Sequence, residues 1–128
     1  MSIQHPKYFF VLLLATFTCC TQTNESENKQ TWQHTYHVKG VIVRGPKNDK
    51  EPREVLIRHE AIDNFINSSG NVEPMRSMTM PFPLSKQITF EDFKEGDEIE
   101  FVYQMNWSPN PKEEVSSMTT LPKGTVHF

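Results

Sequence analysis

The sequence predicts an all-β domain, a small barrel of five short strands. Five segments carry alternating or β-branched apolar residues, and clusters of Gly, Pro, Asn and Asp separate them. No segment has the pattern of a long helix, and short strands at even spacing are typical of small barrels. With 128 residues the chain is long enough for one such domain and no more.

The first two strands are predicted at residues 36–44 and 54–59. The first is β-branched and ends at a turn cluster of Gly, Pro, Asn and Asp in residues 45–49. The second, with the sequence EVLIRH, is followed by a loop at 61–74, where Asn, Ser and Gly interrupt any strand. A third short strand is predicted at 77–82. Its prolines cannot donate to a central ladder, so it belongs at an edge or at the barrel mouth.

One helical turn is predicted at 89–93, where Thr89 is followed by acidic residues. The fourth strand, residues 98–105, alternates cleanly and places Ile99, Phe101, Tyr103 and Met105 on one face. After a proline-containing loop at 108–111, residues 115–121 return as the fifth strand. This order contains no repeat and no second domain.

The N-terminal segment predicts export. Residues 8–15 form an apolar run that is too short to cross roughly 30 Å of hydrocarbon as a helix, so residues 1–20 are expected to be a signal peptide. Cys19 and Cys20 close this run, at the place where bacterial lipoproteins are cleaved and acylated. We therefore expect a lipid anchor on one of them, with plain secretion as the alternative.

A flexible polar tether is expected at residues 21–34, which leaves 35–128 as the folded domain. Residues 21–31 lack any side chain able to build a core. The membrane contact expected is through the lipid anchor alone. The expected location is the periplasm or the face of the outer membrane.

Composition excludes several classes of function. The net charge is −3 and no basic stripe is present, which argues against nucleic-acid binding. The two cysteines are adjacent, so they join no distant parts of the fold and build no paired-cysteine zinc site. No grouping of Ser, His and carboxylate and no Gly-rich phosphate loop suggests an enzyme.

Methionines supply the strongest chemical signal. Met78 and Met80 alternate along a predicted strand and therefore share one face, while Met75 lies just upstream and His59 ends the preceding strand. Thioethers are soft and uncharged, so with an imidazole they suit Cu(I) or Ag(I) and are poor ligands for Zn²⁺, Ca²⁺ or Mg²⁺. The alternative is that these methionines fill the core, as same-face methionines commonly do.

Four stretches together resemble the CusF-like periplasmic copper-binding family, including the versions that accompany Sco/SenC copper proteins. They are residues 39–42, 55–62, 78–84 and 93–101. The resemblance implies a five-stranded OB-type barrel that holds one Cu(I) or Ag(I) through a histidine and two methionines. On this chain these ligands are His59, Met78 and Met80.

Two departures from the family pattern concern the covering of the ion. Some members place a tryptophan three residues before the Met-Thr-Met sequence, whereas this chain has Met75 there, as in the Sco-associated versions. Met75 is thus a candidate third sulfur ligand. The connection between His59 and Met75 looks longer than usual, with residues 67–71 as the insertion, and loop-closure entropy lets a site survive such a change.

The resemblance implies a monomeric metallochaperone that passes copper to an efflux pump component or to a Sco-type assembly factor. The alternative is a structural or ligand-binding OB-fold lipoprotein without a metal. The other histidines considered and Trp107 are not expected to bind the metal. His34 and His37 face opposite ways and are expected in solvent, His127 lies near the end of the sequence, and Trp107 is expected at the rim.

Overall fold

The computed structural model describes residues 31–128, which form five strands and one short helix. In chain order they are β1 (His34–Arg44), β2 (Glu54–His59), β3 (Met78–Pro83), the 3-10 helix η1 (Phe90–Asp92), β4 (Glu98–Asn106) and β5 (Lys112–Thr120). The predicted signal peptide, Cys19, Cys20 and most of the predicted tether lie outside the described residues. Among residues 31–128 there is no helix with the length and apolar character needed to cross a membrane.

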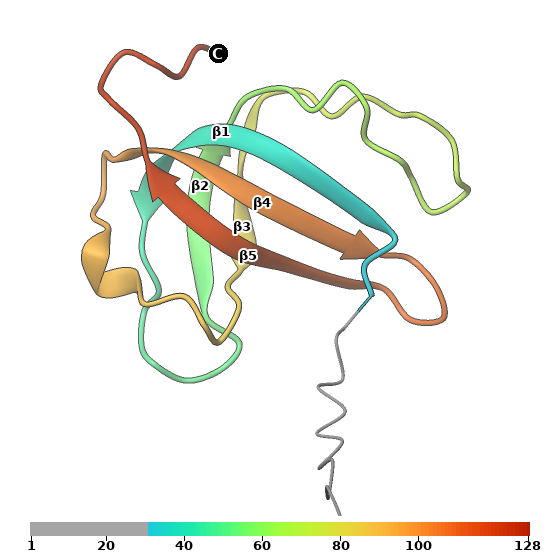
Figure 1. The fold of residues 1–128 in the computed structure, drawn as a ribbon, viewed down its shortest axis with the longest axis horizontal. Helices are drawn as coiled ribbons and strands as arrows, with labels where there is room; N and C mark the ends of the chain where they lie inside the picture. The colour runs from blue at the N-terminus through green and yellow to red at the C-terminus, as the bar shows by residue number, and fades with distance from the viewer. Residues whose placement is uncertain (1–30) are drawn as a thin grey trace, which may run out of the picture.

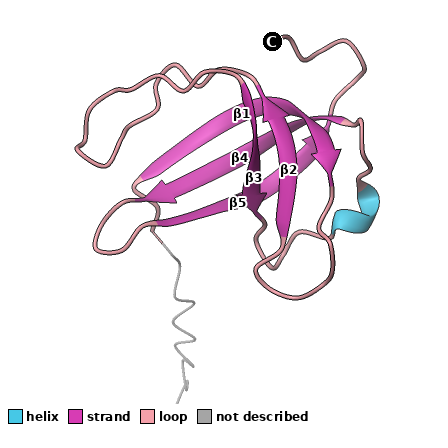
Figure 2. Ribbon diagram, turned by 180° about the vertical axis from the view of Figure 1, so that it is seen from behind, coloured by secondary structure: helices cyan, strands magenta, loops and turns pink. Residues whose placement is uncertain are grey.

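All five strands belong to one antiparallel sheet in the order β3-β2-β1-β4-β5 (Figure 1). The sheet curls so that its two edge strands approach one another, as the view from behind also shows (Figure 2). The contact between these edges includes one parallel bridge, Leu84 with Val115. The predicted all-β class and five strands are confirmed, but the hydrogen-bonded ladder does not close into a continuous barrel.

Strand ends depart from the sequence prediction where a partner strand extends them. β1 begins at His34, two residues early, because His34 pairs with Met105 of β4. The strand therefore includes the last residue of the segment expected to be tether, and Gln33 N donates to Asn106 Oδ1 at 2.6 Å. β5 likewise begins at Lys112 through its pairing with Asn106. Thr89 forms no side-chain cap on η1, contrary to its expected capping role.

The core lies on the concave inner face of the sheet. Alternation sends every second residue of each strand inward, and Val55, Ile57, Phe82, Ile99 and Val115 are completely buried. The ring of Phe82 packs edge-on against Phe101 and Tyr103, with ring centroids 5.0 and 5.1 Å away. These contacts join the β2–β3 half of the sheet to the β4–β5 half.

β3 is an edge strand, as its prolines predict. Pro81 and Pro83 lack the N–H that a central strand needs, and only β2 pairs with this strand along its length. The opposite pairs are Val55 with Phe82, Ile57 with Met80, and His59 with Met78. Because Val55 and Phe82 are buried, this register sends Met78 and Met80 to the inner face as well.

Gly40 permits the close approach of β1 to β2. It pairs with His59, and a Cβ atom at this position would lie 2.6 Å from the Arg58 carbonyl oxygen and 2.7 Å from Ile57 Cγ2. The first of these contacts is with backbone, which cannot rotate away. Glycine is therefore required where β1 supports the end of β2.

We predict that Gly40→Ala destabilises the fold by about 1–3 kcal/mol, the usual cost of overpacking a strand contact. Urea unfolding followed by circular dichroism measures this free energy. Val43→Ala, on the exposed side of the same strand, is the matched control and should change it by less than about 0.5 kcal/mol. Equal stability of Gly40→Ala and the wild type would contradict the close approach.

Candidate metal centre

His59 is the last residue of β2 and points into the inner face of the sheet. Its side chain is completely buried, with 0% exposure, and its ring lies edge-on to Phe82 at 5.7 Å between centroids. Histidine is seldom fully buried without a polar partner for each ring nitrogen. Its hydrogen bonds therefore indicate its role.

The two ring nitrogens of His59 differ. Nδ1 lies 2.7 Å from the carbonyl oxygen of Glu60, and a carbonyl can only accept, so Nδ1 carries the proton. Nε2 is buried and has no hydrogen-bond partner. In a neutral imidazole this leaves the lone pair on Nε2, and an unpartnered buried polar atom costs about 1–3 kcal/mol. Metal-ligating histidines have the same arrangement, in which one ring nitrogen binds the metal and the other donates its N–H to a carbonyl or carboxylate.

Met78 and Met80 lie on the same face of the sheet as His59 through the register of β3. Met78 is directly opposite His59, and side chains in such antiparallel pairs have Cβ atoms about 4.5–5.5 Å apart. Met80 is opposite Ile57 and is the diagonal neighbour of His59, a separation that long side chains bridge. Met78 is 46% exposed, whereas Met80 is half-buried against the core. The structure therefore brings one imidazole and two thioethers to one end of the β2–β3 pair.

Met75 is held near the same end by a separate bridge. Ile62 N donates to Met75 O at 2.8 Å, and Met75 N donates to Ile62 O at 3.0 Å. Ile62 is buried, which anchors this bridge to the core. Met75 and Met78 line one open hollow of about 530 Å³, together with Trp107 and Phe65. Met75 therefore shares this hollow with Met78.

Trp107 is fixed over this hollow. Its indole N–H donates to Ile66 O at 2.8 Å, and its ring is edge-on to Phe65 with centroids 6.3 Å apart. The Tyr36 hydroxyl accepts a hydrogen bond from Ile66 N at 2.9 Å, so both polar groups of the Ile66 backbone are held. The sequence predicts Trp107 at the rim but not its hydrogen bond to Ile66, because the two residues are 41 positions apart in sequence.

Residues 67–71, where the sequence predicts an insertion, form a hydrogen-bonded turn. Asn67 Oδ1 accepts hydrogen bonds from Ser69 N and Asn71 N, both at 3.0 Å. Its Nδ2 donates to Glu73 Oε2 at 2.9 Å, and Gly70 supplies the positive φ of 79° that the turn requires. Asn67 and Ser68 of this turn, together with Glu73, form part of the wall of the hollow.

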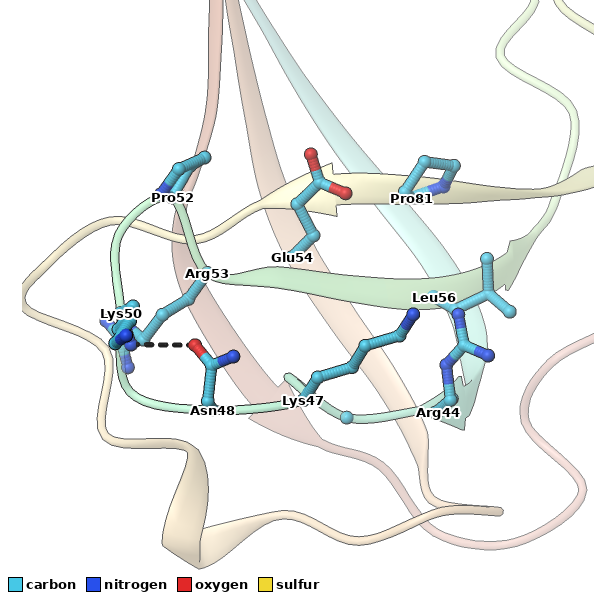
Figure 3. A pocket seen from close by; sticks show the side chains of 10 residues that line it. Arg44, Lys47, Asn48, Lys50, Pro52, Arg53, Glu54, Leu56 and Pro81 are labelled. Carbon is cyan, nitrogen blue, oxygen red and sulfur yellow. Dashed lines mark hydrogen bonds between the residues drawn. The ribbon is translucent and has the colours of Figure 1, made fainter.

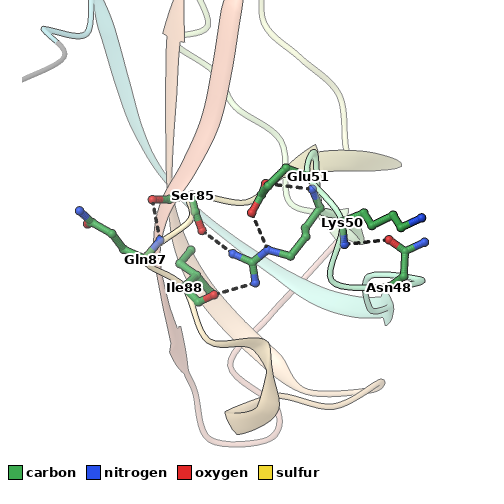
Figure 4. A network of polar contacts seen from close by, with 7 residues as sticks. Asn48, Lys50, Glu51, Ser85, Gln87 and Ile88 are labelled. Atoms are coloured by element: carbon green, nitrogen blue, oxygen red, sulfur yellow. Dashed lines mark hydrogen bonds and ion pairs between the residues drawn. The ribbon is translucent and has the colours of Figure 1, made fainter.

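A second hollow, of about 250 Å³, lies at the opposite end of β2 (Figure 3). Its lining includes Arg44, Lys47 and Lys50, and these cationic groups have no lone pair for a metal ion. Arg53 also lines this hollow, and its guanidinium group has a structural role. It donates hydrogen bonds to Ser85 O at 2.8 Å, to Ile88 O at 2.9 Å and to Glu51 Oε1 at 3.2 Å (Figure 4). We assign no copper chemistry to this end.

The other histidines of residues 31–128 do not join the site. His34 stacks on Tyr36 at 6.4 Å between ring centroids, and the exposed His37 lies 4.0 Å from Glu100. His127 is near the end of β2, where its backbone N–H contacts the Glu60 carboxylate. Within residues 31–128, no three His, Cys, Asp or Glu side chains gather as a metal site.

Comparison with known proteins gives one family match. The family model described as copper binding periplasmic protein CusF matches residues 35–108. A solved structure, apo-CusF residues 6–88 from Escherichia coli, has 19% sequence identity and a TM-score of 0.45, covering 70% of this chain and 89% of its own. No curated protein matches the sequence.

We predict that His59→Leu leaves the free energy of unfolding within about 1 kcal/mol of the wild type. The variant loses one hydrogen bond but also removes the orphaned Nε2, and these effects are of similar size. By comparison, Ile42→Ala, in the same buried core, should cost about 2–5 kcal/mol. Urea unfolding of both variants measures this, and a loss above about 3 kcal/mol for His59→Leu would show that the histidine is held for stability.

Proposed function

Because the chain belongs to the CusF family of copper-binding periplasmic proteins, we propose that it carries one Cu(I) or Ag(I) ion on His59, Met78 and Met80. As a member of this family it is a periplasmic metallochaperone and not an enzyme. The family binds Cu(I) and Ag(I). The assignment of individual ligands, of an anchor and of a receiving protein is our proposal.

The buried, unpartnered Nε2 of His59 is the observation that carries the ligand assignment. A structural histidine would turn this nitrogen toward a protein donor, and no described residue donates to it. A soft cation accepts the lone pair and removes the cost of burying it. The Glu60 carbonyl already holds the Nδ1 proton, so Nε2 is the ring nitrogen that binds the ion.

The methionine ligands select the ion. Thioethers are soft and neutral, so with one imidazole they leave the site uncharged, which favours a soft monovalent cation over Ca²⁺ or Zn²⁺. They also form no disulfides, whereas paired thiolates oxidise in an exported compartment. The donor set therefore suits the periplasm.

Exposure of the ligands supports transfer by ligand exchange. His59 is fully buried and Met78 is 46% exposed, so an incoming donor reaches the ion from the Met78 side. Met75 lines the hollow on this side, and we propose it as a third thioether that binds the ion in transit. Trp107 forms the aromatic wall of this entrance, where its ring shields the ion from water.

We further propose that the domain is tethered to a membrane by a lipid on Cys19 or Cys20. The short apolar signal and the polar segment after it support this arrangement. The receiver is then an efflux pump component or a Sco-type assembly factor, and exchangeable thioether ligands suit delivery to either. The domain acts as a monomer.

Competition for Cu(I) against a chromophoric chelator tests the assignment. We predict one equivalent bound by the wild type. In the double variant Met78→Leu with Met80→Leu, the affinity should fall by more than about 100-fold, since loss of an outer-shell partner alone costs 10–100-fold. Leucine is used because Met-to-Leu exchange conserves volume and spares the core.

Met118→Leu is the matched control, because Met118 packs against the core from β5 and is not among the proposed ligands. It should bind copper as the wild type does. No binding by the wild type, or unchanged binding by the double variant, would contradict the proposal and favour a role of these methionines in packing.

A further inference from the structure

The segment that follows β5, residues 121–128, folds back along the end of the sheet, and we call it the strap. Leu121 N donates to Glu98 O at 2.7 Å, which extends the pairing with β4 by one bond. A positive φ of 85° at Gly124 then turns the chain. Figure 1 shows the strap leaving the tip of β5 and passing toward the end of β2.

Glu98 holds the middle of the strap. Its Oε2 accepts a hydrogen bond from Gly124 N at 2.6 Å, and its Oε1 accepts one from Val126 N at 2.8 Å. The Val126 N–H is the largest influence that lowers the pKa of this carboxyl below its ordinary value. The ionised side chain therefore binds two successive parts of the turn.

The end of the strap holds β2 on both sides of His59. His127 N donates to Glu60 Oε1 at 2.7 Å, and the Arg58 guanidinium lies 4.0 Å from the centre of the Phe128 ring. Arg58 and Glu60 alternate with His59, so they face outward while the imidazole faces the core. The strap thus contacts the outer side of the β2 segment whose inner side carries the imidazole.

Glu60 links the strap to the imidazole. It follows the last residue of β2, and its N–H donates to Lys39 O at 2.9 Å. Its backbone carbonyl accepts a hydrogen bond from Nδ1–H of His59, and its carboxylate accepts one from His127 N of the strap. The direction of this carbonyl determines which ring nitrogen carries the proton and where Nε2 points. A contact that holds Glu60 in place therefore also holds the orientation of the Nε2 lone pair.

We propose that the strap orients the lone pair of His59 for copper, with Glu60 and Glu98 as its positioning residues. The proposal rests on His59 being a ligand, as argued above. It assigns to the strap, which follows the last strand, a role in the affinity of the site.

Four variants of the full chain test the proposal. Glu60→Ala and Glu98→Ala remove the two carboxylates that hold the strap. Glu60→Gln keeps an acceptor oxygen for His127 N and is the conservative rescue. Glu91→Ala removes a carboxylate of η1, remote from the strap contacts, and is the control.

The first readout is the tautomer of His59 in the metal-free protein, from long-range ¹H–¹⁵N NMR of the imidazole. The wild type, Glu60→Gln and Glu91→Ala should show the single tautomer with the proton on Nδ1. Glu60→Ala and Glu98→Ala should show a mixture of tautomers. The second readout is Cu(I) affinity, expected to fall about tenfold in the two alanine variants and to be retained in Glu60→Gln.

An unchanged tautomer and affinity in Glu60→Ala would overturn the proposal, even if the melting temperature fell, because the strap would then serve stability alone. Failure of the proposed function gives a different result. If the wild type binds no Cu(I), the ligand assignment fails, while the tautomer in the metal-free chain still shows whether the strap orients the ring.

Discussion

The pairing register of β2 with β3 is the constraint on which the proposed copper site depends. Val55 opposite Phe82 packs in the core, and the same register places His59 opposite Met78 four pairs further along. A slip by one residue would turn every side chain of β3 to the other face. Both methionines would then point to solvent while Phe82 lost its contacts with Phe101 and Tyr103. Core packing at one end of the strand pair thereby specifies donor geometry at the other.

The buried imidazole shows a compromise between stability and binding. An orphaned nitrogen costs free energy in the metal-free fold, and the surrounding structure supports it through Gly40 on one side and the Glu60 carbonyl on the other. Such a cost is common where a residue is retained for a ligand. Because Met78 is 46% exposed, an ion bound at the proposed site would remain accessible to exchange.

Sequence reasoning was most successful where local patterns decide the structure. Alternation alone placed Met78 and Met80 on one face, and the prolines of β3 predicted an edge strand. Strand ends were less predictable, since His34 and Lys112 are in strands only because partners reach them. The Trp107 contact with Ile66 and the strap contacts with Glu60 and Glu98 join residues far apart in sequence. No periodicity encodes such contacts, and the acidic run that contains Glu98 resembles an ordinary solvated surface.

The coordination shell of the loaded protein is the most direct test of this account. X-ray absorption at the copper edge of the Cu(I)-loaded chain counts the nitrogen and sulfur donors. We predict one imidazole nitrogen with two or three thioether sulfurs, and loss of the nitrogen in His59→Leu. A shell of nitrogen and oxygen donors without sulfur, or one unchanged in that variant, would contradict the central role given to His59 and the methionines of β3.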